Sequence, residues 1–349
     1  MENKEHIPVC YEGQDDLIDI LATSICSICY NTKSFIDFYI LDCGINNFNK
    51  GQLEKLKYKF NNFSIKYIPI DLTVFNGLKG WGKDNFLDCY SRLLIPKLIP
   101  ELDKVIYLDT DTIALDDIKL LWEQNLDEYE IGACPDTGYN KYLRKNCIEN
   151  LGFNNQQIFI NAGMLLIDCK KWRQNNVSDK LLNLAKTYKD HLIIINEELL
   201  GIYYKNNNFK ILDSHFNCAD RLNEIKEFFP TITDEYLKNE WNDVVIQHLT
   251  PFKPWMFCKN TYNNRNLKNF ENFWFFAQIT PFYQGMVNKY YYNINCNISN
   301  HIIVNIKFGK YWVKLLNVIP FIKVEIKNDN KVYKLFGILP VLKIRSIKC

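Results

Sequence analysis

The sequence predicts an α/β fold in which helices cover a mostly parallel, mixed β-sheet of the Rossmann-like type. Strand-like and helix-like segments alternate from the N-terminus, and each strand-helix unit spans about thirty residues, the length that a parallel crossover needs. A buried apolar run within Lys104 to Leu115 ends on two carboxylates, as expected at the carboxyl end of a strand in such a sheet. The chain has 349 residues, 47% of them hydrophobic, and can therefore bury a large core.

The first part of the chain is expected to alternate strands and helices. The strands are rich in β-branched and aromatic residues, and the helices carry apolar residues three and four positions apart. In chain order these are strand 6–10, helix 16–30, strand 35–41, helix 49–58, strand 64–70 and a helix near 86–98, which Pro96 should kink or end.

The second part continues this pattern with strands at 131–134 and 158–167, helices at 180–188 and 197–204, and a strand at 243–247 that ends at His248. Asn161, Ala162 and Gly163 interrupt the strand at 158–167. A polar-small-glycine break of this kind indicates a bulge or a close approach of the backbone to a ligand.

The most informative stretch is KVIYLDTDTIAL, in which Val105 to Leu108 form a buried strand that ends on Asp109, Thr110 and Asp111. Because side chains alternate along an extended chain, Asp109 and Asp111 point to the same side and can converge on one hard cation. The alternative is a solvated turn from strand to loop, although the apolar run before it favours a buried site.

Cysteine usage and charge narrow the class of protein. The twelve cysteines are scattered, Cys26 and Cys29 have the spacing of buried residues on a helix, and the N-terminus lacks a signal-peptide pattern, so we expect a reducing cytoplasm. No apolar run has transmembrane length, and no Walker or G-x-G-x-x-G loop is present. The segment from Lys289 onward contains ten lysines, one arginine and two acidic residues, so its net charge is +9. Because the whole chain has a net charge of +2, the residues before Lys289 have a net charge of −7.

Several motifs occur together in a defined order over residues 7 to 258. They are YSRLLIPKLIPELDKVIYLDTDTIAL, INAGMLLIDCKKW, NEELLGIYY and HLTPFKPW. This set resembles the family 8 glycosyltransferases, which are retaining, sugar-nucleotide-dependent enzymes of the GT-A fold and include bacterial lipooligosaccharide galactosyl- and glucosyltransferases and glycogenin. The resemblance implies a GT-A catalytic domain over 1–258.

The resemblance also implies the metal and phosphate contacts. Asp109, Asp111 and His248 would bind Mn²⁺ or Mg²⁺, which neutralises charge on the diphosphate of a UDP-sugar; a mixed carboxylate and imidazole set fits Mn²⁺ better than Ca²⁺. Lys253 would reach the diphosphate as a point charge, and Arg92 would lie near the donor sugar and phosphate.

Further donor contacts follow from the same resemblance. Asn161, with Ala162 beside it, matches a donor-sugar contact, and Thr110 lies within the matched D-x-D motif. Two departures from the family pattern affect the donor site: Asn196 and Glu197 replace Asp-Gln beside the sugar, and Tyr11 and Glu12 replace the uracil-binding residues. Glu197 could stabilise an oxocarbenium-like transition state, act as a nucleophile, or bind sugar hydroxyls. The loop HLTPFK is one residue shorter than usual and lacks the family glycine.

Residues 259–349 are expected to form a helical and β-hairpin segment associated with a membrane. Asn266–Gln278 is predicted to be an amphipathic helix, and Ile302–Lys348 alternates apolar and basic stretches, so the segment could contact an anionic membrane on its cytoplasmic face. The alternative is a small hairpin packed on the catalytic domain. No nucleic-acid recognition module is visible, so nucleic acid is not an expected partner.

The expected function is therefore metal-dependent transfer of galactose or glucose from a UDP-sugar to a lipooligosaccharide, lipopolysaccharide or related glycan, with retention of configuration. LDTDTI also fits the signature of haloacid-dehalogenase-like phosphatases, in which Asp109 would attack phosphate and Asp111 act as acid and base. A third possibility is a sugar-nucleotide-binding protein without catalysis.

Overall fold

The computed structural model describes residues 5–82, 85–136, 141–219, 243–251, 253–255, 264–298, 311–313, 322–327, 330–335 and 339–345. The chain divides into two compact units, Met1–Lys253 and Pro254–Cys349, which we describe separately.

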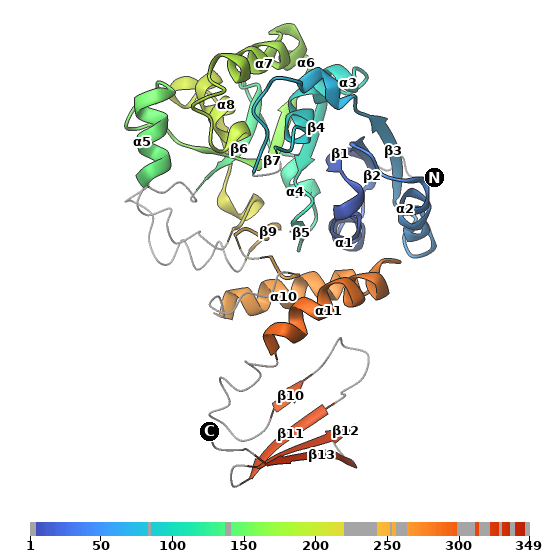
Figure 1. Cartoon of the computed structure of the whole chain (residues 1–349). Helices are drawn as coiled ribbons and strands as arrows, with labels where there is room; N and C mark the ends of the chain where they lie inside the picture. The colour runs from blue at the N-terminus through green and yellow to red at the C-terminus, as the bar shows by residue number, and fades with distance from the viewer. Residues whose placement is uncertain are drawn as a thin grey trace. The chain divides into compact units, whose positions relative to one another are not determined.

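Unit 1 is built on a seven-stranded sheet in the order β3-β2-β1-β4-β7-β6-β8 (Figure 1). The pairs β2–β3, β1–β2, β1–β4 and β6–β8 are parallel, whereas β7 runs antiparallel to both β4 and β6. The strands are β1 (His6–Gly13), β2 (Phe35–Asp42), β3 (Phe63–Pro69), β4 (Lys104–Leu108), β6 (Ile131–Pro135), β7 (Ile160–Asp168) and β8 (Lys210–Ile211). The predicted α/β fold with a mostly parallel, mixed sheet is confirmed.

The described α-helices of unit 1 are α1 (Ile18–Asn31), α2 (Asn47–Leu53), α3 (Ile95–Leu98), α4 (Lys119–Trp122), α5 (Lys141–Asn150), α6 (Cys169–Gln174), α7 (Val177–Thr187) and α8 (Ile195–Tyr203). Short 3₁₀ turns precede α1 and α3 and follow α2. The prediction that Pro96 kinks or ends a helix is wrong: Pro96 lies in the first turn of α3, where the missing N–H has no intrahelical partner to lose.

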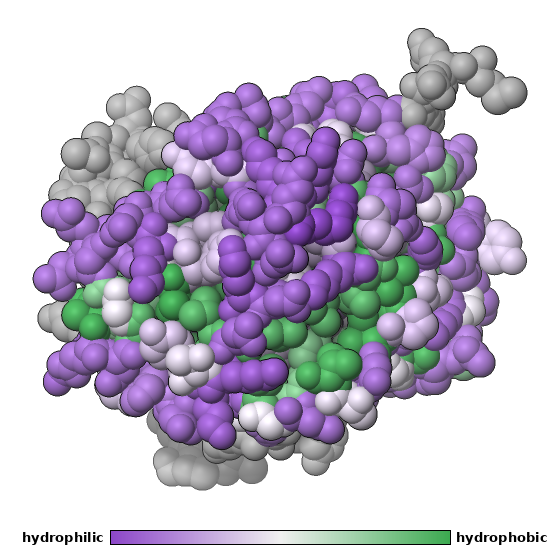
Figure 2. Space-filling view, turned by 90° about the horizontal axis from the view of Figure 1, so that it is seen from above, coloured by the Kyte–Doolittle hydropathy of each residue, from purple (hydrophilic) through white to green (hydrophobic). Residues whose placement is uncertain are grey.

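The two faces of the sheet pack against different helices. Alternate residues of a strand point to opposite faces, so Cys10 and Tyr107 join the apolar cluster that includes Leu181 of α7, whereas Tyr11 reaches Ser24 of α1. The apolar side of α7 is buried, and its other side carries polar residues. Seen from above, unit 1 accordingly presents a mostly hydrophilic surface (Figure 2).

A second, two-stranded sheet fixes the loop after β4 beside the end of β9. β5 (Thr112–Ala114) follows the D-x-D segment directly and pairs antiparallel with β9 (Ile246–His248), with Thr112 opposite His248. The backbone N–H of Asp109 donates to the carbonyl of Gly163 on β7 at 2.8 Å, and that of Leu249 donates to the carbonyl of Asp111 at 2.9 Å. These bonds hold segments that are far apart in sequence together at the carboxyl end of β4.

The register between β6 and β7 shifts close to the carboxyl end of β4. Ala133 pairs with Leu165, but Pro135 pairs with Ile160, so the intervening residues of β7 have no regular partner on β6. This irregular stretch contains Asn161, Ala162 and Gly163, where the sequence indicated a bulge.

Unit 2 contains α10 (Asn264–Ala277), α11 (Tyr283–Ile298) and a four-stranded antiparallel sheet in the order β10-β11-β12-β13. Its strands are β10 (Tyr311–Val313), β11 (Ile322–Lys327), β12 (Asn330–Leu335) and β13 (Leu339–Arg345). None of the helices in the described ranges is both long and apolar enough to span a bilayer. Nine cysteines whose side chains the structure describes are free thiols, and Cys26 and Cys29 are buried as expected.

Candidate functional site

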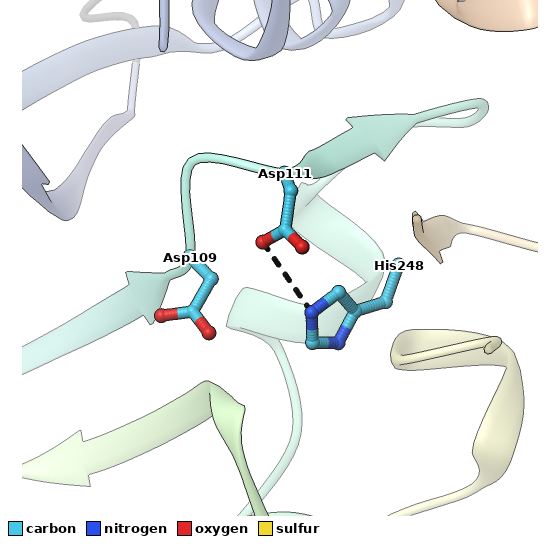
Figure 3. Close-up of side chains that lie close together, drawn as sticks. All are labelled: Asp109, Asp111 and His248. Atoms are coloured by element: carbon cyan, nitrogen blue, oxygen red, sulfur yellow. Dashed lines mark ion pairs between the residues drawn. The ribbon is translucent and has the colours of Figure 1, made fainter. Parts of the chain in front are cut away.

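Asp109, Asp111 and His248 converge at the carboxyl end of β4 (Figure 3). One ligand atom from each residue lies within 4.8 Å of the others, and His248 Nε2 lies 3.4 Å from Asp111 Oδ1. The two carboxylates come from the loop between β4 and β5, and the imidazole comes from the end of β9. Within the described ranges, this group could hold a divalent metal ion.

Each carboxylate also has a cationic neighbour. Arg92 Nη1 lies 2.8 Å from Asp109 Oδ1, and the Tyr107 hydroxyl donates to the same oxygen at 2.8 Å. Lys253 Nζ contacts Asp111 Oδ2. Burial by itself raises the pKa of Asp111, but the charges of Lys253 and His248 outweigh it and hold that pKa well below its usual range. Asp111 is therefore kept ionised and able to bind a cation.

The surroundings of His248 fit a metal ligand. Its Nδ1 lies 2.9 Å from Asn217 Oδ1, which leaves Nε2 toward the carboxylates, and a partner on the second ring nitrogen is usual for ligating histidines. Gly163 makes room for the ring, because a Cβ there would lie 2.4 Å from His248 Cε1 and 2.9 Å from Asp109 Oδ2. Two carboxylates and one imidazole suit Mn²⁺ or Mg²⁺. The residues present thus fit a divalent metal.

These side chains open into a cavity of about 550 Å³ in unit 1, within the range of small-molecule sites. Besides the metal-binding group, its described lining includes Trp81, Arg92, Asp136, Asn161, Asn196, Glu197, Asn217 and Lys253. The amide of buried Asn196 donates to the carbonyl of Cys89 at 2.9 Å, and its Oδ1 has no hydrogen-bond partner among the described residues.

Two glutamates near the cavity are held in their neutral form at neutral pH. Burial raises the pKa of Glu197 to about 8, assisted by repulsion from Asp136 and opposed by Arg92. Burial also raises the pKa of Glu12 to about 8, against the attraction of Arg92, whose Nη2 lies 3.7 Å from Glu12 Oε2. Glu197 can therefore donate a hydrogen bond at pH 7 and becomes a carboxylate above pH 8.

The structure brings most of the predicted site residues together. Asp109, Asp111, His248, Arg92, Lys253, Asn161, Asn196 and Glu197 all line the cavity. Ala162 is fully buried and contributes its carbonyl, which accepts from Arg92 Nη1 at 3.0 Å. Glu12 points toward Arg92. Thr110 lies between the two aspartates but is not part of the described lining.

Tyr11 does not lie where a uracil-binding residue was expected. Its side chain is 0% exposed, and its hydroxyl shares a hydrogen bond of 2.7 Å with Ser24 of α1. Neighbouring residues of a strand point to opposite faces, so Tyr11 and Glu12 cannot both face the donor site. In this structure the Tyr11 ring is part of the core and is not available to a base.

Of the lining residues named above, Trp81, Asp136 and Asn217 were not predicted from the sequence. Asp136 directly follows β6, so the argument from strand ends that found Asp109 could have found it as well. Trp81 is 47% exposed in a loop after β3, and Asn217 follows a 3₁₀ turn at Ser214–Phe216. Neither of these two has a sequence pattern that would have singled it out.

Comparisons with known proteins agree on one family. The family model described as glycosyl transferase family 8 matches residues 8–258 of this chain. The chain is 28% identical over 222 residues to a putative glycosyltransferase of Haemophilus influenzae, covering 62% of this chain and 66% of that protein. It is 29% identical over 239 residues to glycosyltransferase GlyF of Streptococcus pneumoniae, covering 66% of this chain and 56% of that protein. The chain thus spans less than two thirds of the length of these relatives.

Solved structures show the same fold. A galactosyltransferase LgtC in complex with donor and acceptor sugar analogs superposes with a TM-score of 0.63 at 24% identity, covering 76% of this chain and 95% of that one. The bifunctional glycosyltransferase WbbM in its apo form gives a TM-score of 0.65 at 19% identity, covering 82% of this chain and 52% of that one.

Proposed function

The chain belongs to glycosyltransferase family 8, and from this premise we propose that it transfers a hexose, galactose or glucose, from a UDP-sugar to a glycan acceptor with retention of configuration. The observation that carries the proposal is the group of Asp109, Asp111 and His248 in one cavity with Arg92 and Lys253. This arrangement joins a site for a divalent cation to two positive side chains, as a diphosphate ligand requires.

The metal-binding residues act on the leaving group. Asp109, Asp111 and His248 would hold Mn²⁺ or Mg²⁺, which when bound neutralises the charge that develops on the departing diphosphate. Lys253 contacts Asp111, and we propose that it adds a point charge on the same side. Arg92 is held by Asp109 and the Ala162 carbonyl, so its guanidinium is oriented before a donor arrives.

Glu197 is proposed to act on the sugar. It stands at the start of α8, in the cavity that Asp136 and Asn161 also line. With a pKa of about 8, the neutral carboxyl can donate to a sugar hydroxyl or to the glycosidic oxygen at pH 7. The carboxylate form could stabilise positive charge at the anomeric carbon. Asp136, repelled by Glu197 if both are ionised, offers acceptors for further hydroxyls.

The acceptor is proposed to enter past Trp81. This side chain lines the cavity and is 47% exposed, and its loop is fixed by a hydrogen bond from the Tyr90 hydroxyl to the Lys79 carbonyl at 2.7 Å. Large aromatic surfaces present an apolar face together with a polar N–H, which suits the mixed surface of a sugar ring. A lipooligosaccharide, lipopolysaccharide or related surface glycan is the acceptor class we propose.

We also propose that unit 2 brings the enzyme to an anionic membrane on its cytoplasmic face. The +9 charge from Lys289 onward, against −7 for the remainder, favours an orientation with this segment toward anionic lipid. Electrostatic attraction of this kind weakens with salt.

The two other readings of the sequence receive less support. A haloacid-dehalogenase-like phosphatase is not proposed, because the family match covers residues 8–258 and the D-x-D aspartates share their site with His248 and Lys253. A binding protein without catalysis is not proposed, because the chain matches a transferase family over residues 8–258 and keeps Asp109, Asp111 and His248 together in one cavity.

The experiment that tests the proposal is incubation with a panel of UDP-sugars and Mn²⁺, with UDP release followed over hours. One UDP-hexose should be hydrolysed slowly and others not, and a chelator should stop the reaction. Release of inorganic phosphate from phosphomonoesters in place of UDP would support the phosphatase, and binding of UDP-sugar without turnover would support the non-catalytic protein.

A further inference from the structure

A chain of side-chain hydrogen bonds connects the metal-binding group to two loops outside it. Asn161 Nδ2 donates to Asp136 Oδ2 at 2.8 Å, and Asn217 Nδ2 donates to Asn161 Oδ1 at 2.8 Å. Asn217 Oδ1 then lies 2.9 Å from His248 Nδ1. Asn217 and His248 are buried, with 7% and 5% of their surfaces exposed, so water does not replace these contacts easily.

The direction of every bond in this chain is fixed by one backbone group. The N–H of Gly163 donates to Asn161 Oδ1 at 3.0 Å, and since a backbone N–H can only donate, the atom it meets must be the amide oxygen. Asn217 must therefore offer its NH₂ group to Asn161. Its oxygen is left facing the imidazole, which settles an amide orientation that is otherwise ambiguous.

The consequence falls on the tautomer of His248. An amide oxygen only accepts, so Nδ1 must carry the hydrogen, and Nε2 keeps its lone pair in the neutral ring. Nε2 is the nitrogen that lies 3.4 Å from Asp111 Oδ1. A lone pair and a carboxylate oxygen that face each other form a favourable arrangement only around a shared cation, either a metal ion or a proton on Nε2.

The backbone holds Asn217 in this position. The N–H of His248 donates to the carbonyl of Cys218 at 2.9 Å, and the N–H of Cys218 donates to the carbonyl of Ile246 at 2.9 Å. These two bonds join the segment after Ser214–Phe216 to β9 and set Asn217 beside the imidazole.

We propose that Asn217 is a positioning residue, which holds His248 in the Nδ1–H tautomer through the chain Asp136–Asn161–Asn217 and so presents Nε2 to the metal. The inference rests on the proposed metal site and adds a residue that does not itself bind the metal. It also gives Asn161 a second role, because its oxygen accepts from both Gly163 and Asn217 and its NH₂ group donates to Asp136.

The first test measures the tautomer in the full-length, metal-free protein by long-range ¹H–¹⁵N correlation of the imidazoles. Five histidines are present, so the His248 signals can be assigned by their loss in His248→Ala. We expect the Nδ1–H tautomer for wild type near pH 8 and a change toward Nε2–H in Asn217→Leu, which has a similar size but no acceptor. An Nε2–H tautomer in wild type overturns the inference without requiring any variant to fold.

The second test measures the affinity for Mn²⁺ alone by electron paramagnetic resonance. Loss of a partner of a metal-ligating histidine typically weakens binding about 10- to 100-fold, which we expect for Asn217→Leu. Asn217→Asp keeps an acceptor for Nδ1–H but loses the donor to Asn161 Oδ1, so we expect its affinity to lie between those of wild type and Asn217→Leu. The matched control is Asn62→Leu, which removes an equally buried amide, 8% exposed, that donates to the carbonyls of Cys29 and Thr32.

The results distinguish the inference from the function on which it rests. If wild type binds Mn²⁺ and Asn217→Leu binds it as tightly as Asn62→Leu does, the positioning role is wrong and the metal site stands. If wild type binds no Mn²⁺ with or without UDP, the proposed metal site itself fails.

Discussion

Replacing Glu197 by glutamine should stabilise the fold while impairing the reaction. The side chain lines the cavity beside Asp136, and burial raises its pKa from 4.5 to about 8. The folded state therefore binds a proton that the unfolded state releases between these two values. Wild-type stability must fall as the pH rises through this window, because the unfolded state is favoured by ionisation there. Glutamine has no such proton to lose.

The magnitude follows from the two pKa values. A pKa difference of one corresponds to about 1.4 kcal/mol. Relative to a group that does not titrate, ionisation of Glu197 in the unfolded state therefore lowers the free energy of unfolding by about 1 kcal/mol at pH 5 and about 3 kcal/mol at pH 7. At pH 9 the effect approaches about 5 kcal/mol. These figures are upper limits, since the side chain is partly open to the cavity and solvent screens it. The advantage of Glu197→Gln over wild type should therefore grow by about 2 to 4 kcal/mol from pH 5 to pH 9.

The assay is urea unfolding of both proteins at pH 5, 7 and 9 with a chelator present. Glu149→Gln is the matched control, because this glutamate on α5 is exposed and pairs only at 3.7 Å with Lys145. Its stability difference from wild type should stay within about 0.5 kcal/mol at every pH. If the difference between Glu197→Gln and wild type is the same at pH 5 and pH 9, Glu197 is not buried in the way the structure indicates.

Other predictions concern the metal, the backbone around it, the acceptor and the tail. Asp111→Asn and His248→Ala should each lose Mn²⁺ binding and lower turnover at least about 100-fold while the protein still folds, and near-normal turnover in either would contradict the metal assignment. Gly163→Ala should destabilise the fold by about 1 to 3 kcal/mol and weaken Mn²⁺ binding, because the added Cβ would clash with His248. The control is Gly51→Ala in α2, which should be neutral or stabilising because a Cβ there has no atom within 4 Å. Trp81→Ala should raise the acceptor KM and leave UDP-sugar hydrolysis intact, and an unchanged acceptor KM would move the acceptor elsewhere. A chain ending near Tyr283 should keep hydrolysis but lose sedimentation with anionic liposomes, whereas failure of the full-length chain to sediment even at low salt would end the membrane proposal.

The sequence was most informative at the end of β4, where side chains alternate between the two faces of an extended chain. Alternation along the chain predicted that Asp109 and Asp111 share a side, and their ligand atoms do converge with that of His248. The same rule shows why the expectation for Tyr11 was wrong. Since Tyr11 and Glu12 are neighbours on β1, only one of them can point to the donor side, and Tyr11 points to α1.

Contacts that depend on tertiary structure could not be predicted in this way. Asn217 lies in an irregular segment, and its role depends on the bridge between Cys218 and Gln247, which no local pattern encodes. Pro96 was expected to kink or end a helix because proline interrupts helices, but a 3₁₀ turn over Asp88–Leu94 precedes α3, and Pro96 lies in the first turn of α3. Asp136, in contrast, follows a predicted strand and could have been found by the argument that found Asp109.

The central claim is that the cavity at Asp109, Asp111 and His248 binds a metal and a UDP-hexose for transfer. The most direct test is the release of UDP from a panel of UDP-sugars by full-length wild type and Asp111→Asn, with Mn²⁺ or with a chelator. The account predicts release from one UDP-hexose by wild type with Mn²⁺ only, and none above background by the variant. Equal release by wild type and Asp111→Asn, or release that persists with the chelator, would contradict it.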